Sequence, residues 1–266
     1  MTFEARAARF RALHDGPGAL VLPNAWDALS ARIAESCGAA AVATTSAALA
    51  WSQGCADGEA LAFDTLVDRA RAIVEAVDVP VTVDFERGWS SDPEEVAANV
   101  ARLAAIGVVG VNLEDGSEGP ELLARKVAAC KARAPHVFVN ARTDVVLRGL
   151  APAERMVEEV LARARVYEAA GADGFFVPRI TANEAIAAIT SGTRLPVNVM
   201  VIQGLAPVSE LATLGVRRVS AGPRIAEAAF SAARRACKEL LERGTYTEVL
   251  SADLAYPAIQ ALFTTR

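Results

Sequence analysis

The sequence predicts an α/β protein, a single (β/α)8 TIM barrel that occupies residues 1–266. Two observations predict this fold: short apolar segments rich in β-branched residues recur eight times, and segments with the apolar spacing of helices separate them. Neither a linker nor a low-complexity stretch interrupts the alternation. Eight such units within about 250 residues match the number and size of this class of barrel.

The expected elements follow one another along the chain. A helix opens the sequence within residues 1–17, and a helical extension at residues 245–266 follows the last unit. We expect strands at residues 19–23, 39–45, 80–86, 108–114, 137–143, 174–177, 196–201 and 216–221. Helical spacing is clearest at residues 63–77, 93–106, 121–133 and 152–170. Gly38, Gly107, Gly171 and Gly215 each follow an expected helix, where a C-cap takes glycine.

A doubly wound open sheet is the alternative α/β fold. It usually carries a glycine-rich phosphate fingerprint after its first strand, whereas residues 23–27 read PNAWD, so the barrel is favoured. The last helix of the barrel, near residues 224–243, contains six alanines that would allow another helix to approach closely. Two interpretations follow: this helix faces the core and the tail caps it, or it contacts another subunit.

Charge and cysteine content exclude several functions. The 27 Lys and Arg against 32 Asp and Glu give a net charge of −5, without the basic face that a nucleic acid or an anionic membrane requires. The uncharged stretch at residues 36–56 contains too many small and hydroxylated residues for a membrane-spanning helix. Four separated cysteines predict neither a zinc site nor a disulfide framework. We therefore expect a soluble, cytoplasmic protein.

The supply of catalytic side chains is also restricted. The sequence contains two histidines, His14 and His136, and neither follows the C-terminal end of an expected strand. A Ser-His-Asp relay or a histidine-rich zinc site is therefore not expected. All three lysines fall in expected helices, which leaves no candidate for a Schiff base. Carboxylates, arginine, backbone amides and a hard metal ion remain.

Four acids are expected at one end of the barrel. Because side chains alternate between the faces of a strand, Asp84, Glu86 and Glu114 share one phase on neighbouring strands, and Asp57 follows the preceding one. The C-terminal ends of barrel strands form the catalytic face. An all-oxygen set suits Mg²⁺ or Mn²⁺, and such a cation would relieve the repulsion between the acids. The alternative is that they are capping or ion-paired groups on ordinary loops.

Arg142 has the same phase on the next expected strand. Its guanidinium would grip a substrate carboxylate through two parallel hydrogen bonds, which lysine does less well. The alternative role is a salt bridge to Glu114 or Asp144. Asn198, on the seventh expected strand, is a further candidate for substrate binding.

Two turns of small residues are candidates for binding an anionic oxygen. Ser46, Ala47 and Ala48 end the second expected strand, and their backbone amides would serve this purpose. Residues 219–223 (VSAGP) follow the eighth strand, at the usual phosphate position of a barrel. A tight turn explains the second sequence equally well.

Seven motifs occur in the order in which a known family has them. They are PNAWD at 23–27, TS at 45–46, VDFERG at 83–88, NLED at 112–115, NARTD at 140–144, AGAD at 170–173 and VSAGP at 219–223. From about residue 10 to residue 243, the chain resembles the isocitrate lyase / phosphoenolpyruvate mutase superfamily. The resemblance implies a barrel whose eighth helix is swapped between the subunits of a homodimer or homotetramer. It also implies Mg²⁺ and a 2-oxo or enolate-forming carboxylate substrate whose C–C or P–C bond is made or broken.

The resemblance also implies roles for individual residues. By this resemblance four acids would bind the metal, Asp84 as the direct ligand and Asp57, Glu86 and Glu114 through bound waters. The substrate carboxylate would be bound by Ser46, by the amides of Ala47 and Ala48, and by Arg142 opposite them. Catalysis is then expected to depend on Arg142, Asp57 and Glu114.

Three features depart from the family pattern. Glu86 stands where the family usually has Asp, and Ala47 replaces the usual Gly. The mobile loop after the fourth strand is nearly absent, since residues 114–121 (EDGSEGPE) run directly into the next helix. Neither the lyase motif Lys-Lys/Arg-Cys-Gly-His nor the mutase motif Lys-Thr-Asn-Ser is present. Isocitrate lyase and phosphonate mutase activities are therefore disfavoured, because the gating loop that excludes water is missing.

The expected function is that of a Mg²⁺-dependent enzyme that cleaves a C–C bond of a small 2-oxo or hydroxy di- or tricarboxylic acid through an enolate. Decarboxylation of an oxaloacetate-like acid requires least from a gating loop. One alternative is a protein that binds 2-oxoglutarate or pyruvate without turning it over. Another is a barrel that transfers hydroxymethyl groups to 2-oxo acids, which would need a folate for which the sequence gives no signal.

Overall fold

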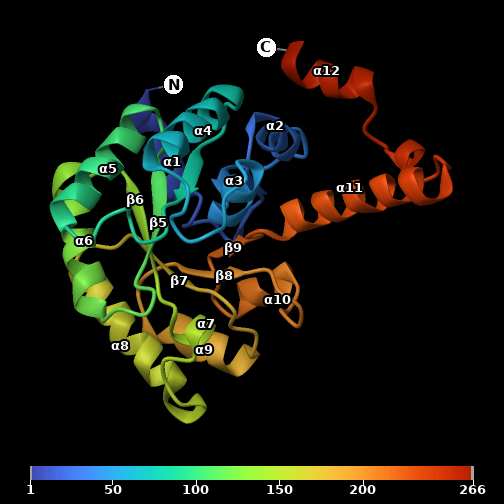
Figure 1. Ribbon diagram of the computed structural model, residues 1–266. Helices are drawn as coiled ribbons and strands as arrows, with labels where there is room; N and C mark the ends of the chain where they lie inside the picture. The colour runs from blue at the N-terminus through green and yellow to red at the C-terminus, as the bar shows by residue number, and fades with distance from the viewer. Residues whose placement is uncertain (1, 265–266) are drawn as a thin grey trace.

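The computed structural model describes residues 2–264 and confirms the nearly closed barrel (Figure 1). Its parallel strands lie in one sheet in the order β1-β9-β8-β7-β6-β5-β4-β3-β2. They are β1 (Leu20–Leu22), β2 (Asn24–Ala25), β3 (Val42–Thr44), β4 (Val81–Asp84), β5 (Gly110–Glu114), β6 (Phe138–Arg142), β7 (Gly174–Val177), β8 (Val197–Met200) and β9 (Arg218–Ser220).

The first expected strand is divided into two at Pro23. Its first half, β1, pairs with β9, and its second half, β2, pairs with β3, so the two together join the ends of the sheet. Proline has no N–H to donate, but the carbonyl oxygen of Pro23 still accepts a hydrogen bond from the amide of Ala43 at 3.1 Å. The eight expected strands are thus present as nine.

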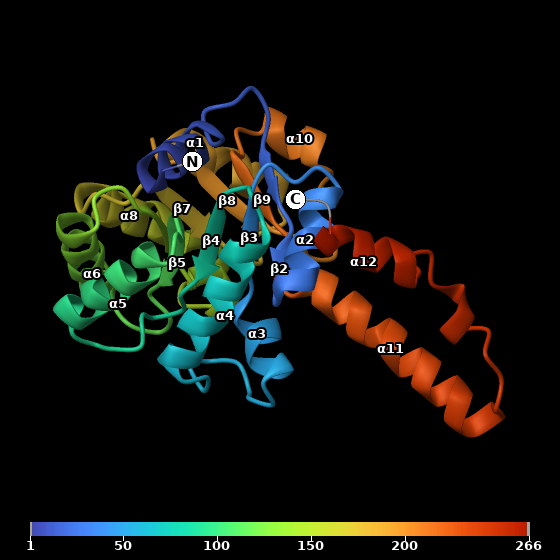
Figure 2. The same ribbon diagram turned by 90° about the horizontal axis from the view of Figure 1, so that it is seen from above.

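Helices surround the sheet, and several of them cover its outer surface (Figures 1 and 2). They are α1 (Phe3–Ala12), α2 (Ala28–Ser36), α3 (Ser46–Ser52), α4 (Phe63–Ala76), α5 (Pro93–Ala105), α6 (Pro120–Arg133), α7 (Val145–Arg148), α8 (Met156–Ala169), α9 (Asn183–Gly192), α10 (Val208–Thr213), α11 (Arg224–Arg243) and α12 (Tyr256–Thr264). Short 3-10 turns lie at Ala153–Arg155 and Val249–Ser251.

Helix α5 shows how the sequence specifies these elements. The side chain of Asp92 accepts a hydrogen bond from the amide of Glu94 at 3.0 Å, and Pro93 occupies the first turn. The helix ends before Gly107, whose φ of 96° is strained for any other residue. Between these signals the expected apolar stripe is buried, at roughly 2 kcal/mol for each large side chain. Val96, Val100 and Leu103 are fully buried, whereas Ile106, the fourth residue of the expected stripe, is half-buried.

Helix α1 closes the N-terminal end of the barrel. Phe10 is fully buried and packs edge-on against Phe138, with ring centroids 5.4 Å apart. The ring of His14 stacks on Phe138 at 4.3 Å, and its Nδ1 donates a hydrogen bond to the carbonyl oxygen of Phe10 at 2.9 Å. Because this end is plugged by packed rings, a ligand can enter the barrel only at the opposite end.

The register of the strands confirms the expected polar interior. Asp84 lies opposite Asn112, which lies opposite Asn140, and Asn198 lies opposite Arg218. The residues between these positions, such as Val83 and Val111, are fully buried toward the helices. The interior therefore changes from aromatic rings near α1 to amides and charges near the C-terminal ends of the strands.

Helix α11 does not pack against the barrel along its length. It projects from the body, and α12 returns toward α2, where Arg32 Nε donates to the carbonyl oxygen of Leu262 at 2.6 Å (Figures 1 and 2). Only Ala226 and Glu239 are buried in α11, so the interpretation of a core-facing helix is wrong. We call residues 224–264 the arm. No helix in residues 2–264 is long and apolar enough to cross a membrane.

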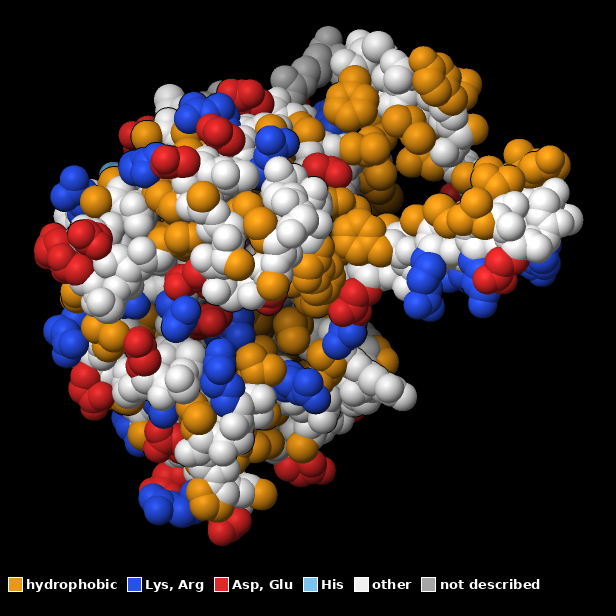
Figure 3. All heavy atoms as spheres, viewed as in Figure 1, with side chains coloured by type: hydrophobic (Ala, Val, Ile, Leu, Met, Phe, Trp, Pro, Cys, Tyr) orange, Lys and Arg blue, Asp and Glu red, His pale blue; other side chains and the backbone are white. Residues whose placement is uncertain are grey.

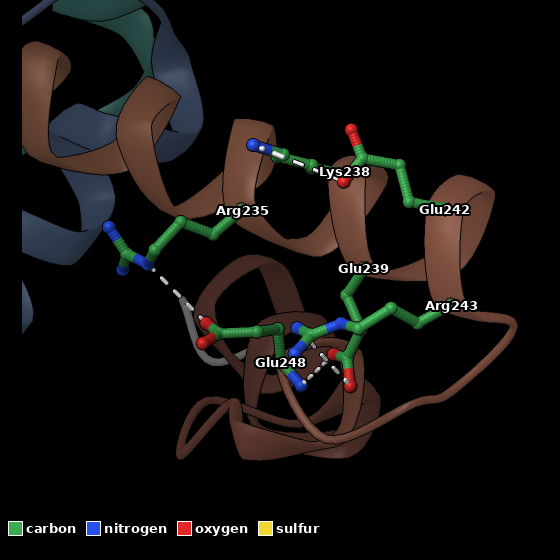
Figure 4. Close-up of a pocket in the computed structure, with 6 residues that line it drawn as sticks. All are labelled: Arg235, Lys238, Glu239, Glu242, Arg243 and Glu248. Carbon is green, nitrogen blue, oxygen red and sulfur yellow. Dashed lines mark hydrogen bonds and ion pairs between the residues drawn. The ribbon is translucent and has the colours of Figure 1, made fainter.

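A buried carboxylate holds the outer turn of the arm together (Figure 4). Glu239 accepts hydrogen bonds from the Thr245 hydroxyl at 2.6 Å, from the Thr247 amide at 3.1 Å and from the Glu248 amide at 2.5 Å. These bonds hold the pKa of Glu239 below its usual value, since each favours the charged form. The turn at the end of α11 is thus a defined structure.

Candidate functional site

A cavity of about 170 Å³ opens at the C-terminal ends of the barrel strands. It is lined by Asn24, Thr45, Ser46, Ala47, Asp57, Asp84, Asn112, Arg142, Phe176, Met200, Ser220, Gly222 and Pro223. Five of the residues expected from the sequence are among them: Ser46, Ala47, Asp57, Asp84 and Arg142. Larger hollows occur on the surface, but this cavity is the one that contains the polar ends of the strands.

Asp84 ends β4 and carries an unpaired oxygen in this cavity. Its amide donates to the Thr44 hydroxyl at 2.9 Å, and its Oδ2 accepts from the Ser46 amide at 3.2 Å. Its Oδ1 is buried and has no hydrogen-bond partner within the described residues. Burial raises the pKa of Asp84 and the charge of Asp57 raises it further, while Arg142 acts in the opposite direction. An unpaired buried carboxylate oxygen requires a donor or a cation.

Arg142 ends β6 and faces the same cavity. Its Nη1 forms an ion pair with Glu114 Oε2 at 2.6 Å, and its Nε donates to Asp144 Oδ1 at 2.7 Å. The guanidinium carbon lies 5.8 Å from the centre of the Phe176 ring. Both expected roles are therefore compatible, because the two salt bridges use Nη1 and Nε and leave Nη2 without a hydrogen-bond partner among the described residues.

Asp115 supports Arg142 indirectly, through Asp144. Its Oδ1 accepts from the Asp144 amide at 2.8 Å, while its Oδ2 accepts from Arg163 Nη1 at 2.8 Å and from the Tyr167 hydroxyl at 2.5 Å. Its side chain is fully buried. Asp115 therefore ties helix α8 to Asp144, which in turn holds Arg142. This role could not be predicted from the sequence, because Asp115 lies in a loop and its partners are distant in the chain.

The other three acids are arranged less closely than expected. Asp57 lines the cavity from an exposed loop, whereas Glu86 and Glu114 are buried beside it and do not line it. Burial and the charge of Asp84 raise the pKa of Glu86 to about 8, and burial raises that of Glu114 to about 7 against the effect of Arg142. Within residues 2–264, no three carboxylate, imidazole or thiol groups converge to form a ready-made metal site.

The loop that carries Glu86 has an unusual backbone. Glu86 and Trp89 have positive φ values of 40° and 57°, in the region that favours glycine. Glu59, from the loop of Asp57, accepts hydrogen bonds from the amides of Arg87 at 3.1 Å and Trp89 at 2.9 Å. One carboxylate thus joins the two loops that carry acids around the cavity.

The expected substrate cradle is partly assembled. Ser46 begins α3, and its amide is occupied by Asp84, while Ala47 lines the cavity. Ala48 is fully buried and does not line the cavity. Asn198 lies beneath the floor, where its Oδ1 accepts from the Ser220 hydroxyl at 3.1 Å.

Four polar residues of the interior were not assigned a role from the sequence. Asn24 accepts from the Gly222 amide at 2.9 Å and donates to the carbonyl oxygen of Thr44 at 2.6 Å, which joins the first and last strands. Asn112, Ser220 and Arg218 form the floor of the cavity and the layer beneath it. Asn24 and Asn112 lie within motifs of the sequence, so strand phase could have identified them.

The donor set fits a hard divalent cation. The available ligands are carboxylate oxygens, with no histidine or cysteine among the residues that line the cavity. The unpaired Oδ1 of Asp84 would gain a partner, and the repulsion that raises the pKa of Glu86 would fall. Of the four expected acids, Asp84 and Asp57 line the cavity and could contact such an ion, whereas Glu86 and Glu114 are buried beside it.

The fold and the cavity define a (β/α)8-barrel protein with an acid-and-arginine site at the C-terminal ends of the strands, where barrels of this class bind their substrates. Residues 10–241 match the sequence model of the phosphoenolpyruvate phosphomutase family. The chain belongs to this family, within the isocitrate lyase / phosphoenolpyruvate mutase superfamily, and the expected resemblance is confirmed.

Individual relatives cover nearly the whole chain. An oxaloacetate decarboxylase of Bradyrhizobium sp. strain BTAi1 is 31% identical over 259 residues, 91% of this chain and 86% of the relative. A solved structure from Burkholderia cenocepacia J2315 has a TM-score of 0.91 and 35% identity, and the match covers 98% of this chain and 97% of the other. Phosphonopyruvate hydrolase, solved in complex with oxalate and Mg²⁺, has a TM-score of 0.85 over 97% of this chain and 94% of its own, and its 24% identity shows the fold alone.

Proposed function

We propose that this protein is a Mg²⁺-dependent enzyme that cleaves a C–C bond of a small 2-oxo or hydroxy di- or tricarboxylic acid. The observation that carries the proposal is the cavity, in which the unpaired Oδ1 of Asp84 and the guanidinium of Arg142 face one small space. A cation at Asp84 and a guanidinium opposite it form a binding site for an acid with two adjacent oxygen groups.

The side chains around the cavity have separate tasks in this proposal. Arg142 binds the substrate carboxylate through the guanidinium nitrogen that its salt bridges leave unused, and Ser46 and Ala47 contact the same end of the acid. Asp84 would hold Mg²⁺, and Asp57, Glu86 and Glu114 would contribute further negative charge near it. When bound, Mg²⁺ would neutralise the negative charge that develops on the substrate as the bond breaks.

A proton must be supplied after the bond breaks. When the C3–C4 bond of an oxaloacetate-like acid breaks, C4 leaves as carbon dioxide and the electron pair stays on C3 as part of an enolate, and C3 then takes up one proton. Asp57 is exposed at the mouth of the cavity, so we assign to it the positioning of the solvent water from which this proton comes. Glu114 is engaged with Arg142, and its task is to keep the guanidinium charged and in place.

Decarboxylation of an oxaloacetate-like acid is the reaction that the site supports best. Only residues 115–119 separate β5 from α6, so this connection is too short to close over the cavity as a lid. The oxaloacetate decarboxylase relative, which matches most of the chain, gives independent support. Nothing in the fold or among the relatives supports a protein that binds 2-oxo acids without turnover.

The test is turnover by the purified chain with oxaloacetate, 2-methylisocitrate and phosphonopyruvate, each with Mg²⁺ and with a chelator. Since Mg²⁺ alone promotes the decay of oxaloacetate, rates are compared with protein-free buffer and with Asp84→Asn. Asp68→Asn, an exposed acid on α4, is the matched control. We expect a Mg²⁺-dependent rate that Asp68→Asn retains and Asp84→Asn loses. A rate equal to that in protein-free buffer for all three acids would contradict the proposal.

We also propose that the protein is a homodimer or homotetramer in which the arm packs on another subunit. Nine of the fourteen exposed large hydrophobic side chains found in residues 2–264 lie in the arm. They are Ile225, Phe230, Leu240, Leu241, Tyr246, Val249, Leu250, Tyr256 and Phe263. Figure 3 shows apolar side chains along the side of α11 that faces the gap toward α12, and charged side chains along its opposite side. An apolar surface of this extent is typical of an interface.

The body offers a surface that α11 leaves uncovered. Val21, on the outer face of β1, is 47% exposed, although strands of a barrel are normally covered by helices. It lines an apolar groove of about 480 Å³ between β1 and α2. Light scattering coupled to size exclusion should give the mass of a dimer or tetramer, which Leu241→Glu lowers and Lys238→Gln on the same helix does not. A monomeric wild-type chain would contradict this proposal.

The four cysteines bear on the redox environment in which the protein works. Cys37, Cys55, Cys130 and Cys237 are all unpaired. Burial raises the pKa of Cys130 to about 12, so this thiol is unreactive near neutral pH. Four free thiols support a reducing compartment such as the cytoplasm, and a full titration of thiols in the denatured, unreduced protein tests it.

A further inference from the structure

Arg218 is a buried cation without an acidic partner. It begins β9, is 1% exposed and is the largest fully buried side chain of the described residues. None of its nitrogens is bonded to a carboxylate, and its Nη1 has no hydrogen-bond partner within residues 2–264. Removing a guanidinium from water without an ion pair costs several kcal/mol. Packing alone does not account for that cost, because a long apolar side chain such as methionine would avoid it.

Arg218 contacts two residues that line the floor of the cavity. Its Nη2 donates to Asn112 Oδ1 at 3.1 Å, and its Nε donates to the Ser220 hydroxyl oxygen at 3.3 Å. Both residues line the cavity, whereas Arg218 does not. Arg218 therefore acts on a ligand only through these two side chains.

The contacts fix which way the amide of Asn112 points. Its Oδ1 accepts from Arg218 and also from Asn140 Nδ2 at 2.9 Å. A carbonyl oxygen can accept two hydrogen bonds, whereas an NH₂ group in that position would face two donors. The Nδ2 of Asn112 therefore faces the cavity, and it is neither bonded to a described residue nor enclosed.

The contacts also fix the Ser220 hydroxyl. It accepts from Arg218 Nε and donates to Asn198 Oδ1, so its hydrogen points away from the cavity. The cavity floor then presents one donor, the amide of Asn112, beside a hydroxyl whose own proton is already engaged. Replacing Arg218 by an apolar residue would free both groups to turn.

We propose that Arg218 is a positioning residue that orients the Asn112 amide as a donor, so that the floor binds an oxygen of a carboxylate substrate from below. The identity of the substrate rests on the proposed function, whereas the geometry of Arg218, Asn112 and Ser220 does not depend on it. Arg218 also places a positive charge beneath the site. Burial lowers its pKa to about 9 and the charge of Asp84 opposes this, so the guanidinium stays protonated near neutral pH.

The experiment measures the binding of oxalate, a small dicarboxylate probe, by calorimetry in the presence of Mg²⁺. Arg218→Lys keeps the charge but not the two directed contacts, and Asn112→Asp replaces the donor by an oxygen that still accepts from Arg218 and Asn140. We expect each to weaken oxalate binding by about ten- to a hundredfold, the value of a hydrogen bond to a charged acceptor. Arg217→Lys, the neighbouring arginine at the closed end of the barrel, is the matched control.

Non-additivity separates positioning from direct binding. If Arg218 acts through Asn112, the double variant binds oxalate no more weakly than Asn112→Asp alone. Wild-type affinity in Arg218→Lys would overturn the inference, and so would full additivity. An Arg218→Lys chain that does not fold would also overturn it, because the arginine would then serve the fold rather than the site.

A second measurement does not depend on the proposed function. In ¹⁵N-labelled protein, the side-chain NH₂ signals of Asn112, assigned by comparison with Asn112→Asp, report its orientation and mobility. We expect them to shift in Arg218→Lys and to stay in place in Arg217→Lys. If the signals shift but no acid binds or turns over, the proposed function fails while the positioning role stands. Unshifted signals would contradict the positioning role.

Discussion

Replacing Asp115 by asparagine should destabilise the protein and loosen Arg142 together. The change keeps the shape of the side chain but removes the charge that faces Arg163 Nη1 at 2.8 Å. The Asp144 amide can still donate to the remaining oxygen, and the Tyr167 hydroxyl can turn to accept from the new amide. Arg163, whose side chain is 9% exposed, then faces an NH₂ group in place of a carboxylate.

The magnitude follows from burial. Breaking a buried pair by removing one partner costs about 3–5 kcal/mol. Arg163 keeps a second partner, Glu159 Oε1 at 2.9 Å, so the lower end of that range applies. We therefore expect a loss of about 3 kcal/mol in the free energy of unfolding, out of roughly 5–15 kcal/mol for a typical domain.

The assay is urea unfolding followed by circular dichroism, with Glu159→Gln as the matched control. Glu159 binds the same guanidinium, but its side chain is 38% exposed, so its loss should cost at most about 1 kcal/mol. Oxalate binding in Asp115→Asn should weaken as well, because a neutral amide oxygen holds the Asp144 amide less firmly than a carboxylate does, and Asp144 orients Arg142. The reasoning is refuted if the two variants are equally stable, or if Asp115→Asn is destabilised but binds oxalate like wild type.

Three further predictions concern other parts of the molecule. Arg142→Lys should weaken oxalate binding about ten- to a hundredfold in calorimetry, because one ammonium cannot serve Glu114, Asp144 and a ligand together; unchanged affinity would contradict the assigned role. Burial lowers the pKa of His14 to about 3, so the unfolded chain binds more protons between pH 6.5 and 3, and stability falls on acidification. In urea unfolding, His14→Gln should reduce the dependence of the free energy of unfolding on pH by about 1.4 kcal/mol per pH unit, and the same pH dependence in variant and wild type would refute this prediction. Gly88→Ala should cost more than Gly38→Ala in thermal melting, since both have positive φ but only a Cβ at Gly88 would lie 2.8 Å from Val96; equal costs would refute the packing argument.

Much of the barrel could be predicted because its causes are local. Alternation of strand and helix, proline at the start of α5 and glycine after α2 and α5 each specify an element through a few neighbouring residues. Strand phase also predicted that Asp84 and Arg142 would face one space, because the ends of parallel strands meet at one end of a barrel.

The parts that could not be predicted depend on contacts between distant residues. Arg163 and Tyr167 reach Asp115 from about fifty positions away, and no pattern of spacing shows such a cluster. Phase alone also overestimated the convergence of the acids, since Glu114 turns to Arg142 and Glu86 lies in a loop with a positive φ. The position of α11 could not be predicted either, because its alanine-rich sequence was compatible both with a core-facing helix and with a contact to another subunit.

Calorimetric titration of oxalate into the wild-type chain with Mg²⁺, into the same chain with a chelator, and into Asp84→Asn with Mg²⁺ tests the central claim most directly. We predict saturable heat of binding in the first titration and none in the other two, because Asp84 and the cation form one half of the site. Equal binding in all three titrations would show that the acid binds without Asp84 and the metal, and would contradict the account.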